Sequence, residues 1–360
     1  MNDEHYMQIA LNLARTAAGQ TSPNPPVGSV VVKDGEILGM GAHLRAGEPH
    51  AEVHALNMAG DNAEGATIFV TLEPCSHYGK TPPCADLIIE RGIRRAVVAV
   101  TDPNEKVAGR GIEKLRKAGI EVELGVMQKD AEAVNAVFFH YTRTKTPYVT
   151  MKSAVSFDGK TATRTGDSKW ITGEAARLDV HQYRHKHDAI LVGAGTVIAD
   201  NPSLTTRIPH GGKNPIRIVL DRKLRTPLDT KVLNDGQAET WIFTEAGEQD
   251  HAPYLEKEQV TVIQLDQLTV EHVLQELGKR NVMSLFVEGG ATVNGSFLES
   301  RRINQLVTYM APKLIGGKLS PTSIGGEGFA SMAETLSLEI TQVEMIGSDL
   351  KIVAEPGKDD

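Results

Sequence analysis

Residues 48–54 read Glu-Pro-His50-Ala-Glu52-Val-His54, and residues 73–84 read Glu-Pro-Cys75-Ser-His-Tyr-Gly-Lys-Thr-Pro-Pro-Cys84. The second segment holds both cysteines of the 360-residue chain. A catalytic zinc ion takes three protein ligands from His and Cys and keeps a fourth position for water, and His50, Cys75 and Cys84 supply such a set. We expect His50 and Cys84 in the first turns of two helices, where the helix dipole favours a thiolate. Glu52 is close enough to move a proton from that water to a leaving amine, so the two segments predict hydrolytic loss of ammonia.

Two other kinds of zinc site use similar residues. The pair His50 and His54 resembles the H-E-x-x-H helix of zinc peptidases, but the glutamate stands one position later. It would point about 100° away around the helix, so we exclude a peptidase. A closed structural site with His77 as a fourth ligand would also hold zinc, although it would not require Glu52.

The sequence around these segments predicts an α/β domain. An amino-terminal helix carries Met7, Leu11 and Ala14 on one face. Asp34-Gly35 separates two strand-like runs and is a strong hairpin signal, and the later strands alternate with helices, which favours parallel pairing. The expected strands are residues 28–33, 36–40, 66–72, 95–101 and 120–125, and the expected helices are residues 50–59, 84–91, 109–118 and 130–141.

A polar segment at residues 142–147 is the expected domain boundary, because Pro147 cannot continue the preceding helix. Beyond it, helical patterns lie between several strand-like runs, which predicts a second α/β domain with antiparallel C-terminal strands. These runs are residues 148–152, 189–192, 216–220, 239–243, 260–265, 284–287 and 305–310. We therefore expect two domains, residues 1–145 and residues 146–360.

The charge balance limits the partners of the chain. With 46 acidic and 38 basic side chains the formal charge is −8, so there is no surplus of cations to neutralise nucleic-acid phosphates. Two cysteines give no disulfide framework, no apolar run approaches about 18 residues, and the acidic start is unlike a signal peptide. We expect a cytoplasmic protein that binds neither nucleic acid nor membranes.

The metal-site residues resemble the zinc-dependent cytidine-deaminase superfamily, whose pattern is H-x-E followed by P-C-x-x-C. Here eight residues separate the two cysteines instead of two. This longer loop, together with Asn24-Pro-Pro-Val-Gly28, is similar to the pyrimidine deaminases of riboflavin biosynthesis. The resemblance implies that Asn24 and His43 contact the pyrimidine and that Lys80 and Thr81 contact the substrate phosphate.

The second half of the chain lacks a complete dinucleotide-binding fingerprint. Gly193-Ala-Gly195-Thr-Val-Ile198 begins like one and fails at its last position. Residues 285–296 instead read Leu-Phe-Val-Glu288-Gly-Gly290-Ala-Thr-Val-Asn-Gly-Ser, which predicts a buried strand, a glycine pair and a helix start. Such a turn lets backbone N–H groups approach a diphosphate, although it is equally typical of an ordinary tight turn.

Other segments of this half resemble the dihydrofolate-reductase-like reductases of the riboflavin pathway. With the deaminase motifs, the similarity to the bifunctional riboflavin-biosynthesis deaminase/reductase family extends along essentially the whole chain. It implies an N-terminal cytidine-deaminase-like α/β/α domain and a C-terminal dihydrofolate-reductase-like α/β domain. The segments are Lys152-Ser-Ala154-Val-Ser-Phe-Asp158-Gly-Lys160, Gly166-Asp-Ser168-Lys-Trp170-Ile, Val192-Gly-Ala-Gly-Thr196-Val-Ile-Ala-Asp200-Asn-Pro-Ser-Leu204 and Glu288-Gly-Gly290.

The resemblance also implies a substrate and cofactors. In this family the first domain uses Zn²⁺ to deaminate 2,5-diamino-6-ribosylamino-4(3H)-pyrimidinone 5′-phosphate. The second domain then reduces the ribosyl group to ribityl with NADPH. We further expect a homo-oligomer, for which the sequence gives no number of subunits.

The residues of the reductase site follow from the same resemblance. Reduction needs an acid near the sugar ring oxygen, and Lys152, Asp200 and Glu288 are unranked candidates. Arg184 and Arg207 are suited to bind a phosphate bidentately. The implied cofactor contacts are Ala154, Trp170, Thr196, Asp200, Asp221, Gly290, Ala291, Thr292, Val293, Asn294, Gly295 and Ser296, and the implied substrate contacts are Ser168, Arg184, Leu204, Arg207 and Glu288.

Two smaller features each allow two interpretations. The basic pair Arg222-Lys223 follows a strand-like run and suits the extra phosphate of NADPH, but such a pair is also typical of a solvated loop. His181 and His185 stand one helical turn apart and could chelate a metal. With no third ligand nearby, a polar helix face explains these two histidines better.

Two other functions are alternatives to the bifunctional enzyme. A deaminase that edits single-stranded nucleic acid would want cations and stacking aromatics, whereas this chain is acidic and only 5% aromatic. A non-catalytic protein would combine a structural zinc site with a nucleotide-binding module. That alternative predicts four protein ligands on the zinc rather than three and a water.

Overall fold

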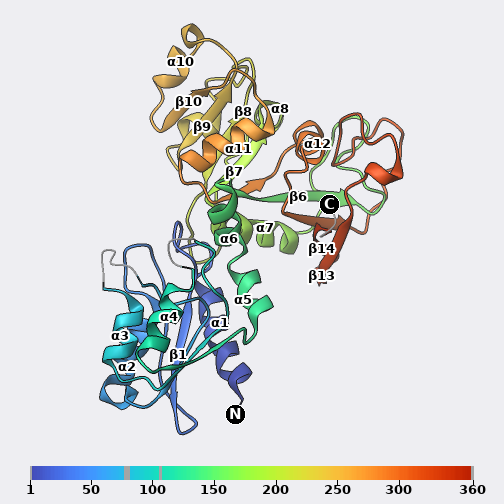
Figure 1. The fold of residues 1–360 in the computed structure, drawn as a ribbon. Helices are drawn as coiled ribbons and strands as arrows, with labels where there is room; N and C mark the ends of the chain where they lie inside the picture. The colour runs from blue at the N-terminus through green and yellow to red at the C-terminus, as the bar shows by residue number, and fades with distance from the viewer. Residues whose placement is uncertain (1, 77–81, 105–107, 358–360) are drawn as a thin grey trace. The chain divides into compact units, whose positions relative to one another are not determined.

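The computed structural model describes residues 2–76, 82–104 and 108–357 (Figure 1). The chain divides into two compact units, Met1–Lys145 and Thr146–Asp360. Each unit has its own β-sheet and is described by itself. Within the described ranges, no helix combines the length and the apolar character that a membrane span requires.

The sheet of the N-terminal unit consists of β1 (Gly28–Lys33), β2 (Glu36–Ala42), β3 (Thr67–Val70), β4 (Arg95–Val98) and β5 (Glu121–Leu124). The strands lie in the order β2-β1-β3-β4-β5. β1 and β2 form the predicted antiparallel hairpin, and the φ angles of Asp34 and Gly35 in its turn are 51° and 84°. An Asp-Gly pair tolerates this left-handed backbone. β3, β4 and β5 pair in parallel, as predicted.

Helices cover both faces of this sheet, because successive side chains of a strand point to opposite faces. Val30 and Val32 of β1 pack into the core beneath α1 (Asp3–Ala17), α5 (Gln128–Val134) and α6 (Ala136–Thr144). Val31 packs into the opposite core beneath α2 (Ala51–Ala59), α3 (Cys84–Glu90) and α4 (Arg110–Lys117). These layers confirm the predicted α/β/α architecture.

One helix of this unit differs from its prediction. The single helix expected over residues 130–141 is two helices, α5 and α6, which meet at Asn135. Asn135 is fully buried, and its side-chain amide donates to the carbonyl oxygen of Ala131 at 3.1 Å. Such a side-chain bond competes with the helical backbone ladder. The apolar pattern continues across the break, so periodicity did not reveal it.

The sheet of the C-terminal unit has nine strands in the order β10-β9-β8-β7-β11-β6-β12-β14-β13. These are β6 (Tyr148–Ser156), β7 (Ala189–Gly193), β8 (Ile216–Leu220), β9 (Thr240–Thr244), β10 (Val260–Gln264), β11 (Ser284–Val287), β12 (Gln305–Ala311), β13 (Leu338–Ile346) and β14 (Asp349–Pro356). All seven expected strands are present. The prediction of antiparallel C-terminal strands is confirmed, because β12 runs parallel to β6 on one side but antiparallel to β14 on the other, and β14 runs antiparallel to β13. The strands β13 and β14 themselves were not predicted from the sequence.

Helices also cover both faces of this larger sheet. One face packs against α11 (Val270–Lys279) and α12 (Ala291–Glu299). The other packs against α7 (Glu174–Lys186), α8 (Ala194–Asp200), α9 (Lys231–Asn234) and α10 (Ala252–Leu255). Short 3-10 helices are η1 (Gly60–Ala63), η2 (Glu248–Asp250) and η3 (Met332–Glu334). The carboxyl ends of the parallel strands β6, β7 and β11 share one edge, the usual place for ligands in such sheets.

Candidate metal centre and ligand pockets

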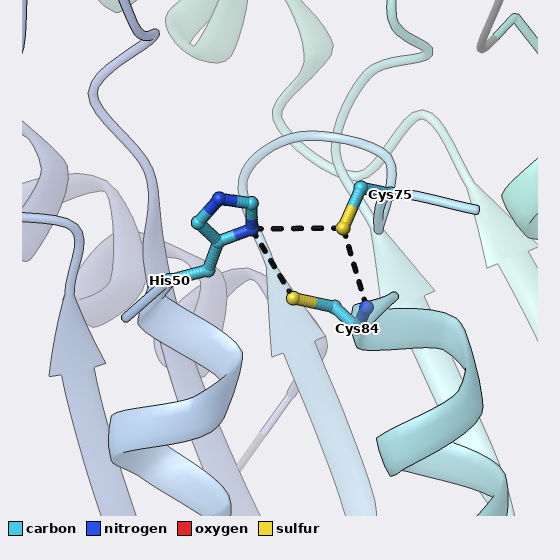
Figure 2. A group of neighbouring side chains, drawn as sticks. All are labelled: His50, Cys75 and Cys84. Atoms are coloured by element: carbon cyan, nitrogen blue, oxygen red, sulfur yellow. Dashed lines mark hydrogen bonds between the residues drawn. The ribbon is translucent and has the colours of Figure 1, made fainter. Parts of the chain in front are cut away.

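Three side chains of the N-terminal unit converge at the starts of two helices (Figure 2). His50 is the N-cap residue of α2, one position before the expected first turn, whereas Cys84 is the first residue of α3. The Nδ1 atom of His50 lies 3.6 Å from Sγ of Cys75 and 3.3 Å from Sγ of Cys84. Ligands bound tetrahedrally to zinc at its usual distances lie roughly 3.3–3.8 Å apart. The donor set therefore fits a zinc ion.

No other cluster of metal-ligating side chains occurs in the described part of the chain. The ligand atoms of the three residues all lie within 4.8 Å of one another. The backbone N–H of Cys84 also donates to Sγ of Cys75 at 3.2 Å. The hydrogen bond between the two thiols lowers the pKa of Cys75, despite its burial, and raises the pKa of Cys84. His77, the fourth ligand of the structural alternative, lies outside the described residues.

Glu52 lies beside these three residues in the first turn of α2. Its side chain is buried, and burial raises the pKa of its carboxyl to about 7, with a further contribution from the Cys75 thiolate. A carboxyl that titrates near neutrality can both accept and donate a proton there. Glu52 is thus a buried carboxyl group beside the three metal-ligating side chains.

A cavity of about 230 Å³ opens over the metal-ligand group. Asn24 and His43, expected to contact the pyrimidine, both line it. Nδ1–H of His43 donates to the carbonyl of Pro49 at 3.2 Å, so Nε2 accepts from the Asn24 amide at 3.0 Å. Lys80 and Thr81, expected at the phosphate, lie outside the described residues. The lining residues are Asn24, Pro25, Val27, His43, His50, Glu52, Leu72, Glu73, Cys75, Asp102, Asn104 and Phe138.

The sequence reading missed the part played by Glu73, two residues before Cys75. Its buried carboxylate accepts four backbone N–H groups, from Asp102 (3.3 Å), Gly109 (2.9 Å), Gly111 (2.9 Å) and Ile112 (3.4 Å). The position of a carboxylate after a buried strand could have indicated a structural role. Its partners are backbone N–H groups, which every residue except proline has, so the sequence could not identify them. Glu73 ties the Cys75 segment to the start of α4.

The C-terminal unit has a pocket of about 680 Å³ that brings together many of the expected reductase residues. They come from β6, the end of β11, the segment before α7, α7 itself, the segment after α8, and the start of α12. The expected residues in its lining are Lys152, Ala154, Ser168, Trp170, Arg184, Arg207, Glu288, Gly290, Ala291 and Asn294, and we call it the substrate pocket.

Lys152, Arg184 and Glu288 form a partly buried charged group in the substrate pocket. Arg184 donates from Nε (2.6 Å) and Nη2 (3.1 Å) to the Glu288 carboxylate, and its Nη1 donates to the carbonyl of Thr205. Nζ of Lys152 lies 4.0 Å from Glu288. Burial lowers the pKa of Lys152, whereas the nearby cations outweigh burial and lower that of Glu288. Two donors of Arg184 are therefore engaged by Glu288, and Arg207, the other arginine expected at the phosphate, lines the same pocket.

The two histidines of α7 do not form a metal site. Nδ1 of His185 accepts from the backbone N–H of Lys213 at 3.0 Å, while His181 lines the substrate pocket. Burial and the charges of Arg184 and Arg207 lower the pKa of His181 to about 4, so its ring is neutral near pH 7. His181 therefore belongs to the pocket wall and not to the solvated polar face expected for it.

A second pocket, of about 850 Å³, adjoins the first through Gly290 and Ala291. We call it the nucleotide pocket, and it lies along the β7–α8 turn and α12. Gly193 and Arg222 also line it. The expected cofactor residues in its lining are Thr196, Asp200, Gly290, Ala291, Thr292, Val293 and Ser296.

Four of the predicted reductase residues do not line the pocket that their predicted role requires. Asp200 lines the nucleotide pocket, where it pairs with Lys169 at 3.7 Å, and not the pocket of Lys152 and Glu288. Asp221 is fully buried and accepts from the backbone N–H and hydroxyl of Thr226, both at 2.7 Å. Leu204 is also buried and lines neither pocket. Gly295 is a packing residue, because a Cβ there would come 2.4 Å from the carbonyl oxygen of Gly325.

Two family models match the chain, one in each unit. Residues 1–100 match the cytidine and deoxycytidylate deaminase zinc-binding region, and residues 147–352 match the RibD C-terminal domain. The fold, the metal-ligand group and these matches define an enzyme of two α/β domains, a zinc-binding cytidine-deaminase-like domain followed by a dihydrofolate-reductase-like reductase domain.

Full-length relatives identify the family. The chain is 55% identical to riboflavin biosynthesis protein RibD of Bacillus amyloliquefaciens, over 99% of this chain and 98% of that protein. Its structure resembles that of Acinetobacter baumannii RibD, with a TM-score of 0.89 and 38% identity over 99% of both chains. A deaminase/reductase from Thermotoga maritima gives a TM-score of 0.89 and 40% identity over 98% of both chains. The chain belongs to the RibD family of bifunctional riboflavin-biosynthesis deaminase/reductases.

Proposed function

We propose that the chain is a cytoplasmic enzyme that acts twice on one phosphorylated pyrimidine. Residues 1–145 deaminate 2,5-diamino-6-ribosylamino-4(3H)-pyrimidinone 5′-phosphate, and residues 146–360 then reduce its ribosyl group to ribityl with NADPH. The observation that carries this proposal is the placement of a buried carboxylate, Glu52, beside three zinc-type ligand atoms that lie within 4.8 Å of one another.

In the deaminase site, His50, Cys75 and Cys84 hold zinc, which when bound supplies a Lewis acid that activates water. Glu52 accepts the proton of the attacking water and donates it to the departing ammonia, a role supported by its pKa of about 7. Asn24 and His43 orient the pyrimidine in the cavity. Lys80 and Thr81 bind the phosphate in this proposal.

In the reductase site, the substrate pocket takes the ribosyl phosphate and the nucleotide pocket takes NADPH, which supplies the hydride. A Cβ on Gly193 would come 3.0 Å from Val293, so the bare glycine backbone keeps this wall open to a dinucleotide. We assign the acid to Lys152, because it shares the substrate pocket with Arg207 and Glu288 whereas Asp200 does not. The lowered pKa of Lys152 favours proton donation to the sugar oxygen.

We assign the remaining cofactor and substrate contacts according to which pocket each residue lines. Ala154 and Trp170, which line the substrate pocket, contact the nicotinamide end of the cofactor in this proposal. Its remaining contacts are Thr196, Asp200, Gly290, Ala291, Thr292, Val293 and Ser296, which line the nucleotide pocket. Ser168, Arg207 and Glu288 contact the substrate, and Arg184 holds Glu288 in place.

We also propose that the chain forms a homo-oligomer. Four apolar side chains of the edge strand β13 are exposed: Leu338 (42%), Ile340 (60%), Val343 (57%) and Met345 (65%). An exposed apolar strand at a sheet edge favours self-association.

The test of the double activity is a paired assay on Glu52→Gln, a variant that keeps the size of the side chain but cannot carry the proton. Given substrate and NADPH, the wild-type chain should release ammonia first and oxidise NADPH after a lag. Glu52→Gln should keep its zinc, lose ammonia release by about 100-fold or more, and still oxidise NADPH with substrate deaminated beforehand. Normal ammonia release by the variant would contradict the role of Glu52, and the absence of both signals in the wild type would contradict the substrate.

A further inference from the structure

The nucleotide pocket has a cationic corner formed by Arg222 and Arg225. Both lie in the segment that follows β8. Nε of Arg222 pairs with the Glu245 carboxylate at 3.2 Å, and Nη2 of Arg222 donates to the carbonyl of Leu268 at 3.4 Å. Arg225 is exposed, and among the described residues its guanidinium has neither an ion-pair partner nor a hydrogen-bond partner. In this corner, Arg222 is held by its protein partners, whereas the guanidinium donors of Arg225 are available to a ligand.

The segment that carries Arg225 is held in one conformation by buried polar groups. Asp221 accepts both donors of Thr226, as described above, and its carbonyl accepts the N–H of Leu224 at 3.2 Å. The hydroxyl of Tyr254 lies 2.8 Å from the carbonyl oxygen of Leu224 and 2.7 Å from that of Thr226, on either side of Arg225. A fixed backbone reduces the entropy lost when the arginine binds. Lys223, in the same segment, does not line the pocket.

The start of α12 also lines this pocket. Gly290 is the N-cap of the nine-residue helix α12, and its first residues, Ala291 and Thr292, line the pocket. The N–H groups of a helix start suit a diphosphate. A dinucleotide with its diphosphate there has one end beside the substrate pocket, which adjoins at Gly290, and its other end free to extend toward the arginines.

The carboxylates around the pocket do not cancel this positive corner. Asp200 pairs with Lys169 at 3.7 Å, and Glu271 pairs with Arg302 at 3.6 Å. Glu299 is the last residue of α12, at the far end of that helix from Gly290. Arg225 is the lining cation without a partner carboxylate among the described residues.

We propose that Arg225, with Arg222 beside it, binds the 2′-phosphate on the adenosine ribose of NADPH and makes the reductase domain select NADPH over NADH. The proposal rests on the reductase function proposed above. A guanidinium binds a phosphate with two parallel charge-assisted hydrogen bonds, and NADH lacks this phosphate. The assignment moves the expected role from the pair Arg222-Lys223 to the pair Arg222-Arg225.

The experiment measures binding and turnover in the full-length chain with Arg225→Ala and, as its matched comparison, Lys223→Ala. Calorimetric titration with 2′,5′-ADP and 5′-AMP reports the contribution of the 2′-phosphate without catalysis. The wild type and Lys223→Ala should bind 2′,5′-ADP about 10- to 100-fold more tightly than 5′-AMP. Arg225→Ala should lose most of this difference, raise the KM for NADPH by a similar factor, and leave kcat and the KM for NADH unchanged.

The outcomes separate this inference from the proposed function. If Arg225→Ala keeps the wild-type preference for 2′,5′-ADP, or if Lys223→Ala loses it, the assignment to Arg225 is wrong. If the wild type reduces substrate equally well with NADH, the inference is wrong while the reductase activity stands. If the wild type oxidises neither cofactor with deaminated substrate, the proposed reductase function fails and the inference fails with it.

Discussion

Individual residues divide into those whose chemistry is visible in the sequence and those whose role depends on a distant partner. His50, Cys75 and Cys84 could be predicted as a set because few other side chains bind zinc and the chain has only two cysteines. Arg184 shows the opposite case. Its residue type predicts a phosphate contact, and the folded chain adds a pairing with the Glu288 carboxylate at 2.6 Å that the sequence did not indicate. A sequence gives the number of charges, but it does not show which charges pair across 104 residues.

Glu73 gives the sharpest prediction at the level of one residue. A glutamine there would turn two N–H donors toward the N–H groups that the carboxylate now accepts. We expect Glu73→Gln to destabilise the N-terminal unit by about 3 kcal/mol, to weaken zinc binding and to reduce ammonia release. Metal analysis, thermal unfolding and the ammonia assay check these effects.

The same chain supplies the controls for Glu73→Gln. The reductase activity with deaminated substrate should be unchanged, because the four N–H groups that Glu73 accepts all belong to the N-terminal unit. Glu113 is exposed on α4 and pairs with Lys117, so Glu113→Gln should change neither zinc content nor ammonia release. Wild-type zinc content and activity in Glu73→Gln would show that Glu73 does not position Cys75.

Secondary-structure elements were predictable where one face is buried and the pattern is unbroken. The seven predicted strands of the C-terminal unit include runs such as Ser284–Val287, in which every residue is buried. β13 gave no such signal, because Leu338–Ile346 mixes apolar and charged residues and is largely exposed. A register shift between Ile340 and Gln342 also breaks its period-two pattern. Sequence patterns indicate which residues are buried. β13 is an edge strand whose side chains are largely exposed, so its sequence did not predict it.

The shift in β13 has a consequence for self-association. Leu338, Ile340, Val343 and Met345 pair with Pro356, Ala354, Ile352 and Leu350 of β14, which alternate along that strand. All four apolar side chains therefore lie on one face of the sheet despite the bulge. We expect Ile340→Lys combined with Val343→Lys to shift the chain toward monomers, measured by light scattering after gel filtration. Gln342→Lys, on the other face of β13, should leave the mass unchanged, and an unchanged mass for the double variant would exclude this face as the contact.

At the level of the whole molecule, the chain is two units with separate sheets and separate cores. The proposed metal ligands all come from the first unit and the proposed reductase residues all come from the second. Bound zinc adds its binding free energy to the folding stability of the unit that holds it. The two activities should therefore respond independently to loss of the metal.

We expect a zinc chelator to abolish ammonia release while NADPH oxidation with deaminated substrate stays within about twofold of the untreated rate. Differential scanning calorimetry should show the unfolding of the first unit at lower temperature after chelation, because a ligand that binds only the folded state stabilises it. Added zinc should restore both the transition and ammonia release, and chelator saturated with zinc beforehand is the control. A parallel loss of NADPH oxidation would show instead that the second unit depends on the metal, and the assignment of zinc to the deaminase alone would have to be abandoned.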